Sequence, residues 1–140
     1  MTDPETDSPP DPHGDGPTPG PFSTLLGFRY IKVNADEAVV ESDPVAEHCN
    51  GAGIVHGGLL ASLLDTTTGW AVHARVPAGV AAPHVHLTVQ YVRAAVPGET
   101  LVCRARCIAV GGRIGSTEAE ITQGGVVVAR GVGTHAVLTR

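Results

Sequence analysis

The residues best suited to chemistry in this chain of 140 lie between Asn50 and Asp65. Asp65 stands in a run of leucine, alanine and threonine, and no other acidic residue occurs between Glu47 and Glu99. A carboxylate in so apolar a segment carries a desolvation penalty unless a partner offsets it. The position therefore predicts either a neutralised structural acid or a carboxylate whose perturbed reactivity serves catalysis.

A second group of chemically useful residues precedes this acid. It combines an amide, an imidazole and two glycines: Asn50, His56, Gly57 and Gly58. If a helix begins at Gly57 or Gly58, its free backbone N–H groups converge on whatever lies beyond that end, where the helix dipole adds partial positive charge. Because glycine lets a ligand approach the backbone closely, this segment has the composition of an oxyanion hole.

Each of these residues also has a purely structural interpretation. The glycines would form a tight turn into the helix, and Asn50 would be a turn residue before Gly51. His56 would cap the loop, and Asp65 would be a buried acid hydrogen-bonded to a threonine or to a neighbouring strand. The catalytic interpretation depends on the four features occurring together.

The spacing of apolar residues predicts a helix from residue 57 to about residue 74. Its buried face recurs at intervals of three and four: Leu60, Leu63, Leu64, Thr67 and Ala71. Such a helix is ~27 Å long and places Asp65 ~12 Å from its own N-terminus. The carboxylate therefore cannot serve a site at the start of its own helix, and a facing element or a second subunit must complete the site.

The other segments of residues 21–140 predict an antiparallel sheet. Alternation indicates one or two strands before the helix, at 28–34 and 38–42, and four after it in meander order, over 85–92, 100–110, 114–122 and 126–138. A short helical turn is expected at 23–27 and an irregular stretch at 43–53. The architecture is α+β, with the helix lying across the sheet. Free edge strands usually pair with a second copy, so we expect a homodimer or a homotetramer.

Charge and composition separate a tail from this domain. Residues 1–20 contain five acids, six prolines and no Lys or Arg, which predicts a disordered acidic tail ahead of a domain at 21–140. The domain then holds nine of the 14 acidic residues against nine Lys and Arg. It has no basic surplus to bind a nucleic-acid backbone, so no nucleic-acid partner is expected.

The cysteines and the apolar runs indicate the compartment. Cys49, Cys103 and Cys107 form neither a CxxC motif nor a dense framework, which favours a reducing cytoplasmic location. The N-terminal residues lack the basic and apolar regions of a signal peptide. No apolar stretch reaches the ~18 residues that a membrane span requires, so no membrane partner is expected.

One motif resembles a known family. His48-x-Asn50-x-x-Gly53-x-Val55-His56-Gly57-Gly58, followed by Asp65, resembles the signature of hotdog-fold acyl-CoA thioesterases of the phenylacetic-acid-degradation type. Residues 91–98 and the pair Gly112-Arg113 resemble later segments of that family, although Ala95 stands where the family usually has proline. The resemblance covers residues 23–138. It implies a hotdog fold, in which an antiparallel sheet wraps around one long central helix.

The resemblance also implies an activity and catalytic roles. Such enzymes hydrolyse acyl-CoA thioesters to free acid and CoA without a cofactor. Asp65 would be the nucleophile or the general base for water, and the Gly57 N–H would hold the developing oxyanion. Asn50 would orient the carbonyl or the water, and His56 would shape the hole. In this family the acid of one subunit faces Asn50 and Gly57 of the other, which meets the distance problem of the helix.

Substrate contacts are expected from four further residues: Gly58, His84, Arg93 and Arg113. The arginines would meet the phosphates of CoA, with Arg104 or Arg106 as further candidates. Similar enzymes carry a polar side chain that assists the carboxylate near the start of the strand after the helix, and this region here holds His84 and His86, so the assisting role stays open. The acyl group, the carrier (CoA or an acyl-carrier protein) and the choice between nucleophile and general base stay open.

Two other functions and a metal site compete with this hypothesis. A non-catalytic acyl-CoA-binding hotdog module usually carries a DNA-binding segment, which this sequence does not show. A hotdog hydratase usually needs an Asp and His dyad on a differently spaced segment, which is also not found. His84 and His86 share one face of a regular strand, but no third ligand lies nearby in sequence, so no metal site is expected.

Overall fold

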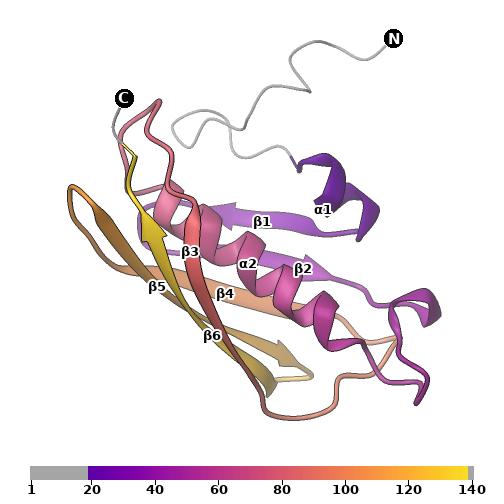
Figure 1. Ribbon diagram of the computed structural model, residues 1–140. Helices are drawn as coiled ribbons and strands as arrows, with labels where there is room; N and C mark the ends of the chain where they lie inside the picture. The colour runs from indigo at the N-terminus through magenta and orange to yellow at the C-terminus, as the bar shows by residue number, and fades with distance from the viewer. Residues whose placement is uncertain (1–18, 139–140) are drawn as a thin grey trace, which may run out of the picture.

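The computed structural model describes residues 19–138, which form one helix-and-sheet unit (Figure 1). The elements are α1 (Pro21–Leu25), β1 (Arg29–Val33), β2 (Ala38–Ser42), η2 (Ala46–His48), α2 (Gly57–His73), β3 (His84–Tyr91), β4 (Leu101–Val110), β5 (Ile114–Gln123) and β6 (Val126–Ala136). Nearly all of the predicted tail at 1–20 lies outside the described residues. Among the described helices, none is long and apolar enough to cross a membrane.

The six strands form one antiparallel sheet in the order β1-β2-β4-β5-β6-β3. The sheet curves behind α2, which lies across it in Figure 1. The elements fall where the alternating and helical patterns predicted them, with ends displaced by only a few residues, and η2 occupies part of the expected irregular stretch. The predicted α+β hotdog architecture is therefore confirmed.

The predicted meander of four strands is wrong in one respect. β4, β5 and β6 follow one another across the sheet, but β3 pairs with β6 instead of β4. The connection at 92–100 is held at the end of the sheet, where Ala95 is buried and the Gln123 amide bonds the backbone of Val96 and Glu99. This connection delivers β4 to the side of β2, and β3 becomes an edge strand.

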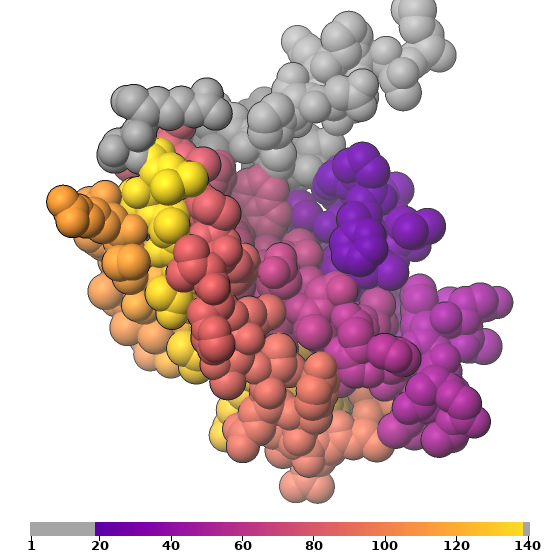
Figure 2. All heavy atoms as spheres, in the orientation of Figure 1, coloured from indigo at the N-terminus to yellow at the C-terminus, as the bar shows by residue number. Residues whose placement is uncertain are grey.

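Helix α2 buries one face against the sheet, as the spacing predicted. Its buried residues are Leu59, Leu60, Leu63, Leu64, Thr67, Thr68, Ala71 and Val72. The two threonines are tolerated there because their hydroxyls donate to the carbonyls one turn earlier, at 2.6 Å and 2.7 Å. The helix packs closely against the sheet at Gly115, since a Cβ on this residue would lie 2.8 Å from Cγ2 of Val72. The opposite face of α2 is visible between β3 and α1 in Figure 2.

Candidate active site

The side chain of His56 caps the N-terminus of α2. Its Nδ1 accepts a hydrogen bond from the Gly58 N–H at 2.7 Å, and its backbone N–H donates to the His48 carbonyl at 2.8 Å. Because Nδ1 accepts, the neutral ring carries its proton on Nε2. A Cβ on Gly58 would lie 2.8 Å from Nδ1, so glycine is needed for the ring to reach the backbone. The Gly58 N–H is therefore used by the cap.

The backbone N–H of Gly57, the first residue of α2, has no hydrogen-bond partner within residues 19–138. It lies at the positive end of the helix dipole. The Tyr91 hydroxyl donates to the Gly57 carbonyl at 3.2 Å, which holds the peptide that follows Gly57. A free donor of this kind suits an oxyanion.

Asn50 combines a structural role with a free donor. Its Oδ1 accepts from the N–H of Ala52 at 2.9 Å and of Ile54 at 3.4 Å, so Asn50 does act as a turn residue. Because these two N–H donors require an acceptor, the side-chain atom facing them is the oxygen, and the amide nitrogen points away from the turn. Within the described residues Nδ2 bonds to nothing, which leaves two donors available beside α2, this amide and the Gly57 N–H.

Asn50, Gly57 and Arg93 line one cleft of about 370 Å³. The other lining residues are Ile54, Val55, Leu60, Tyr91, Val92, Ala94 and Ala95. The Arg93 guanidinium forms no ion pair with any described residue. The structure thus brings three predicted site residues together, with two neutral donors and one cation.

Asp65 lies on the exposed face of α2, two turns after Gly57. Its side chain is 59% exposed, so the interpretation of a buried structural acid is wrong for the single chain. The reason is rotational, because the leucines on either side face the sheet while this position faces outward. Asp65 borders a different cavity, of about 630 Å³, with Trp70, Pro83 and His84 among its walls.

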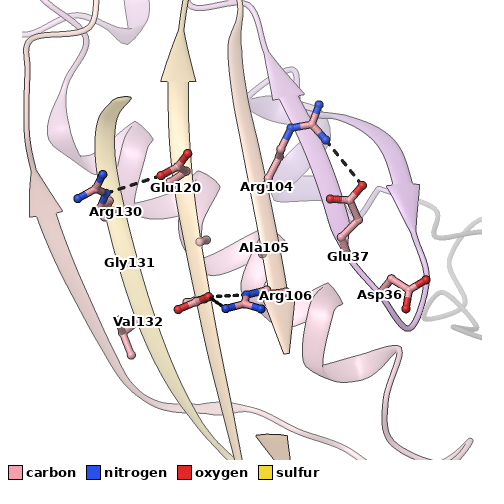
Figure 3. A pocket seen from close by; sticks show the side chains of 11 residues that line it. Asp36, Glu37, Arg104, Ala105, Arg106, Glu120, Arg130, Gly131 and Val132 are labelled. Atoms are coloured by element: carbon pink, nitrogen blue, oxygen red, sulfur yellow. Dashed lines mark hydrogen bonds and ion pairs between the residues drawn. The ribbon is translucent and has the colours of Figure 1, made fainter. Parts of the chain in front are cut away.

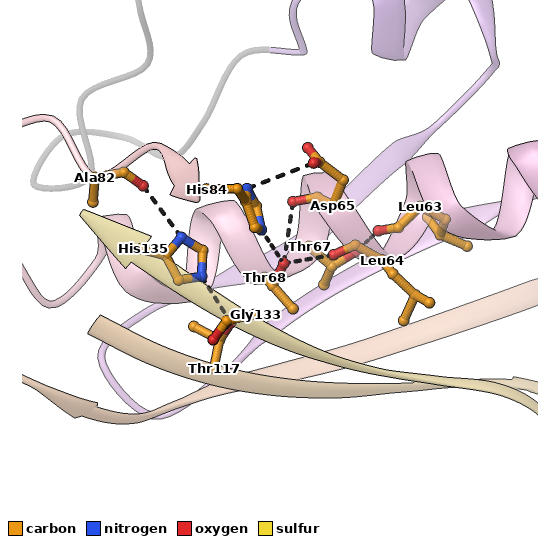
Figure 4. Close-up of polar contacts among 10 residues, drawn as sticks. All are labelled: Leu63, Leu64, Asp65, Thr67, Thr68, Ala82, His84, Thr117, Gly133 and His135. Atoms are coloured by element: carbon orange, nitrogen blue, oxygen red, sulfur yellow. Dashed lines mark hydrogen bonds and ion pairs between the residues drawn. The ribbon is translucent and has the colours of Figure 1, made fainter. Parts of the chain in front are cut away.

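His84, the first residue of β3, lies between Asp65 and the Thr68 hydroxyl on the buried face of α2 (Figure 4). Its Nδ1 lies 3.6 Å from Oδ2 of Asp65, and its Nε2 lies 2.8 Å from the Thr68 hydroxyl. Burial lowers the pKa of His84, and the nearby carboxylate opposes this shift in part. The imidazole is therefore neutral at pH 7 and faces the carboxylate.

His135 is a buried polar residue that sequence analysis missed. It is fully buried, its ring contacts that of His84 with centroids 4.1 Å apart and planes inclined by 45°, and its Nδ1 donates to the Ala82 carbonyl at 3.2 Å. Its Nε2 lies 2.8 Å from the Thr117 hydroxyl. Burial is the main cause that lowers the pKa of His135. A signal was present, because His135 ends the inward-facing series Ala129, Gly131 and Gly133.

His86 does not share a face with His84. The register of β3 against β6 shifts between the two histidines, and His86 bonds the Thr88 hydroxyl at 3.0 Å while His84 contacts α2. The expectation that they share a face is wrong because this irregularity breaks the period of two. Over residues 19–138, three or more His, Cys, Asp or Glu side chains never gather closely enough to hold a metal ion.

The other arginines lie apart from these cavities. Arg113 is exposed in the turn between β4 and β5 and lines neither the Asn50 cleft nor the Asp65 cavity. Figure 3 shows the outer face of the sheet, where Arg104 pairs with Glu37 at 3.7 Å and Arg106 pairs with Glu118. These two guanidinium groups are already matched by carboxylates, so they offer less to a phosphate than Arg93.

Comparison with known proteins agrees with this geometry. The family model described as "Thioesterase superfamily" matches residues 52–129, more than half of the chain. A putative esterase of Archaeoglobus fulgidus is 30% identical over 69% of this chain. The acyl-coenzyme A thioesterase PaaI of Escherichia coli is 32% identical over 69% of it. The aligned segments span 61% and 66% of these two relatives, respectively.

Solved structures extend the likeness to most of the described residues. A conserved protein of Pseudomonas aeruginosa superposes with a TM-score of 0.81 at 33% identity, covering 85% of this chain and 94% of the other. The E. coli PaaI protein from the phenylacetic acid degradation operon superposes with a TM-score of 0.77 at 28% identity, covering 84% of each chain. The resemblance drawn from the Asn50–Asp65 motif is thereby confirmed.

Proposed function

This chain belongs to the thioesterase superfamily, and on that premise we propose that it hydrolyses acyl-CoA thioesters to free acid and CoA. The observation that carries the proposal is the unpaired N–H of Gly57, which opens into the same cleft as the free amide nitrogen of Asn50. The printed name of the E. coli relative, acyl-coenzyme A thioesterase, supports the substrate class.

The two donors hold the thioester carbonyl. When a nucleophile attacks, the carbonyl oxygen gains negative charge, and the Gly57 N–H and the Asn50 amide stabilise it from fixed positions. Loss of one such donor lowers the rate by ~10²–10³. His56 keeps the entry to α2 in place through its cap, and it uses the Gly58 N–H to do so. Gly58 thus contributes to the substrate site through its lack of a side chain.

Asp65 supplies the attack on the carbonyl carbon, either directly or through a water molecule. Eight residues of helix separate it from Gly57, which is ~12 Å along the axis. The carboxylate therefore acts on a substrate held by Asn50 and Gly57 of a second subunit. Its exposure in the single chain supports this arrangement, because a partner is free to approach it.

The dimer forms along the free edge of β3. This edge exposes apolar side chains, with Val85 60% and Tyr91 55% exposed, next to the cavity and the cleft described above. The opposite edge, β1, is occupied by ion pairs of Arg29 with Glu41 and Asp43, and of Lys32 with Glu37. Charged side chains protect an edge from pairing, whereas β3 lacks this protection. A two-fold axis beside β3 produces two equivalent sites, and a homotetramer would contain four.

Arg93 binds the phosphates of CoA at the mouth of the Asn50 cleft. It is the arginine that lines this cleft, and its guanidinium has no carboxylate partner among the described residues. Arg113 lies at the other end of the sheet, so a contact with the substrate requires the second subunit.

The three cysteines are free, which fits the expected reducing cytoplasmic location.

A panel of acyl-CoA esters with a thiol-release assay tests the proposal. Asp65→Asn is expected to fold and to lose at least ~10³-fold in kcat, because the amide is neither a nucleophile nor a base. Asp36→Asn is a matched control, since Asp36 is an exposed acid in the turn between β1 and β2. Full activity of Asp65→Asn would contradict the assignment.

The same panel separates the two competing functions. Tight binding of acyl-CoA without thiol release by the wild-type protein would indicate the non-catalytic binding module. Addition of water to an enoyl-CoA would indicate a hydratase. Free thiol with equal release of acid is the result expected of a thioesterase.

A further inference from the structure

We propose that His84 is the proton-exchange partner of Asp65 during turnover. The inference rests on the proposed function and adds a residue that acts through the carboxylate. His84 starts β3 and meets α2 at two positions one turn apart, the exposed Asp65 and the buried Thr68. Figure 4 shows the imidazole between these two side chains, with one ring nitrogen directed at each.

The hydroxyl of Thr68 can satisfy the imidazole in every protonation state. It lies 2.7 Å from the Leu64 carbonyl, 3.3 Å from the Asp65 carbonyl and 2.8 Å from Nε2 of His84, so its single hydrogen can bond either the helix backbone or the imidazole. When it donates to Leu64, Nε2 carries a proton and donates to Thr68. When it donates to Nε2, the ring proton moves to Nδ1, opposite Asp65.

Proton uptake at Nδ1 therefore breaks no hydrogen bond. Starting from the ring protonated on Nε2, a second proton on Nδ1 points at Oδ2 of Asp65, which is 3.6 Å away. Nε2 still donates to Thr68, and Thr68 still donates to Leu64. The carboxylate stabilises the cation that forms, while the buried side of the ring needs no rearrangement.

Burial favours the neutral form of His84 before the reaction, against the opposing charge of Asp65. Asp65 and Thr68 face it from α2, and His135 contacts it from β6. Burial is the main cause that holds His135 neutral, and the bond that its Nδ1 donates to the Ala82 carbonyl opposes this only in part. Tyr30 of β1 and His73 of α2 line the same cavity. Burial lowers the pKa of His84 below that of a free histidine, so the ring is a proton acceptor at neutral pH.

The proton path balances for hydrolysis by water. Asp65 takes a proton from the attacking water as its oxygen bonds to the carbonyl carbon, and the proton passes to Nδ1 of His84. When the C–S bond breaks, the proton returns through Asp65 to the thiolate, which leaves as the thiol. The acid product releases its own proton to solvent. The ring is neutral again at the end, and no other reactant is consumed.

The pH profile of kcat in His84→Gln tests the inference. Glutamine keeps a polar group near Thr68 and cannot hold a proton. We expect kcat to fall ~10²-fold and KM to change less than roughly twofold, with the acid limb of the profile moved to lower pH. His86→Gln is the matched control, since His86 faces the other side of β3 and is expected to retain the wild-type profile. A His84→Gln protein with the wild-type kcat and profile would overturn the inference.

A measurement without a His84 variant covers the case in which that variant does not fold. The ¹⁵N chemical shifts of His84 report its pKa in the wild type and in Asp65→Asn. We expect the pKa to be lower in Asp65→Asn, because the carboxylate raises it in the wild type. An unchanged pKa would overturn the inference. A wild type that releases no thiol would instead overturn the proposed function, so the two failures are distinguishable.

Discussion

The ring of Tyr91 lies against Gly57, so that a Cβ added to this glycine would be 3.1 Å from Cε1 and 3.3 Å from the hydroxyl oxygen. The same hydroxyl donates to the Gly57 carbonyl at 3.2 Å. Strand β3 therefore holds the peptide between Gly57 and Gly58 from one side, while the Gly57 N–H, on the preceding peptide, stays open to the cleft. The geometry of the oxyanion donor depends on the absence of a side chain at residue 57.

Gly57→Ala tests this dependence. The added methyl group displaces Tyr91 or tilts the peptide, and we expect kcat to fall by ~10–10² because the donor is misplaced. Thiol release measures the effect. Gly51→Ala is the control, since a Cβ at Gly51 meets nothing within 4 Å. Equal activity of both variants would show that the Gly57 N–H does not need its present position.

Substitutions at His56 test its role as the N-cap of α2. His56→Ala removes the acceptor for the Gly58 N–H and is expected to lower the free energy of unfolding by ~1 kcal/mol, the usual cost of a lost N-cap. His56→Asn keeps a good capping side chain and should retain most of the stability. Urea denaturation measures both. A His56→Ala protein as stable as wild type would contradict the capping role.

The contacting histidines His84 and His135 make the fold sensitive to acid. His84 and His135 have pKa values below the ordinary 6.5 because of burial, so the unfolded chain binds protons that the folded chain does not. Stability is fully present above pH ~6.5 and falls as the pH drops from there towards the two folded-state pKa values. We expect the free energy of unfolding in urea to be lower at pH 5.5 than at pH 7.5.

His135→Gln isolates one of these two contributions. Glutamine can still bond Thr117 but does not titrate, so the loss of stability between pH 7.5 and pH 5.5 should be smaller than in the wild type. An equal loss in the variant would show that His135 is not a source of the acid sensitivity.

Much of the fold was predictable from short-range patterns. The period of the leucines located α2, and alternation located the strands, since both patterns depend on which side of a local element is buried. The position of β3 was not predictable in this way. Its place beside β6 depends on the anchoring of the connection at 92–100, which involves Gln123 of β5.

The residues of the site likewise divide into those whose location was predictable from sequence and those whose location was not. Asn50, His56 and Gly57 are close in sequence, so their shared location followed from the predicted helix start. The contact of His84 with Asp65 brings together a strand and a helix face, and sequence analysis related His84 to the carboxylate only through the family resemblance. The exposure of Asp65 agrees with the predicted buried face of α2, which omits this residue, and contradicts only the alternative of a buried structural acid.

The claim that two subunits share each active site is tested most directly by restoration of activity in dimers that combine two inactive variants. Asp65→Asn removes the carboxylate, and Asn50→Asp removes the amide donor while keeping the oxygen that accepts from Ala52 and Ile54. Each variant alone should be nearly inactive. Co-expressed in equal amounts, they should form dimers with one intact site and recover about a quarter of the wild-type kcat per subunit, since random pairing makes half the dimers mixed. Activity that stays at the level of the separate variants would contradict a site shared between subunits.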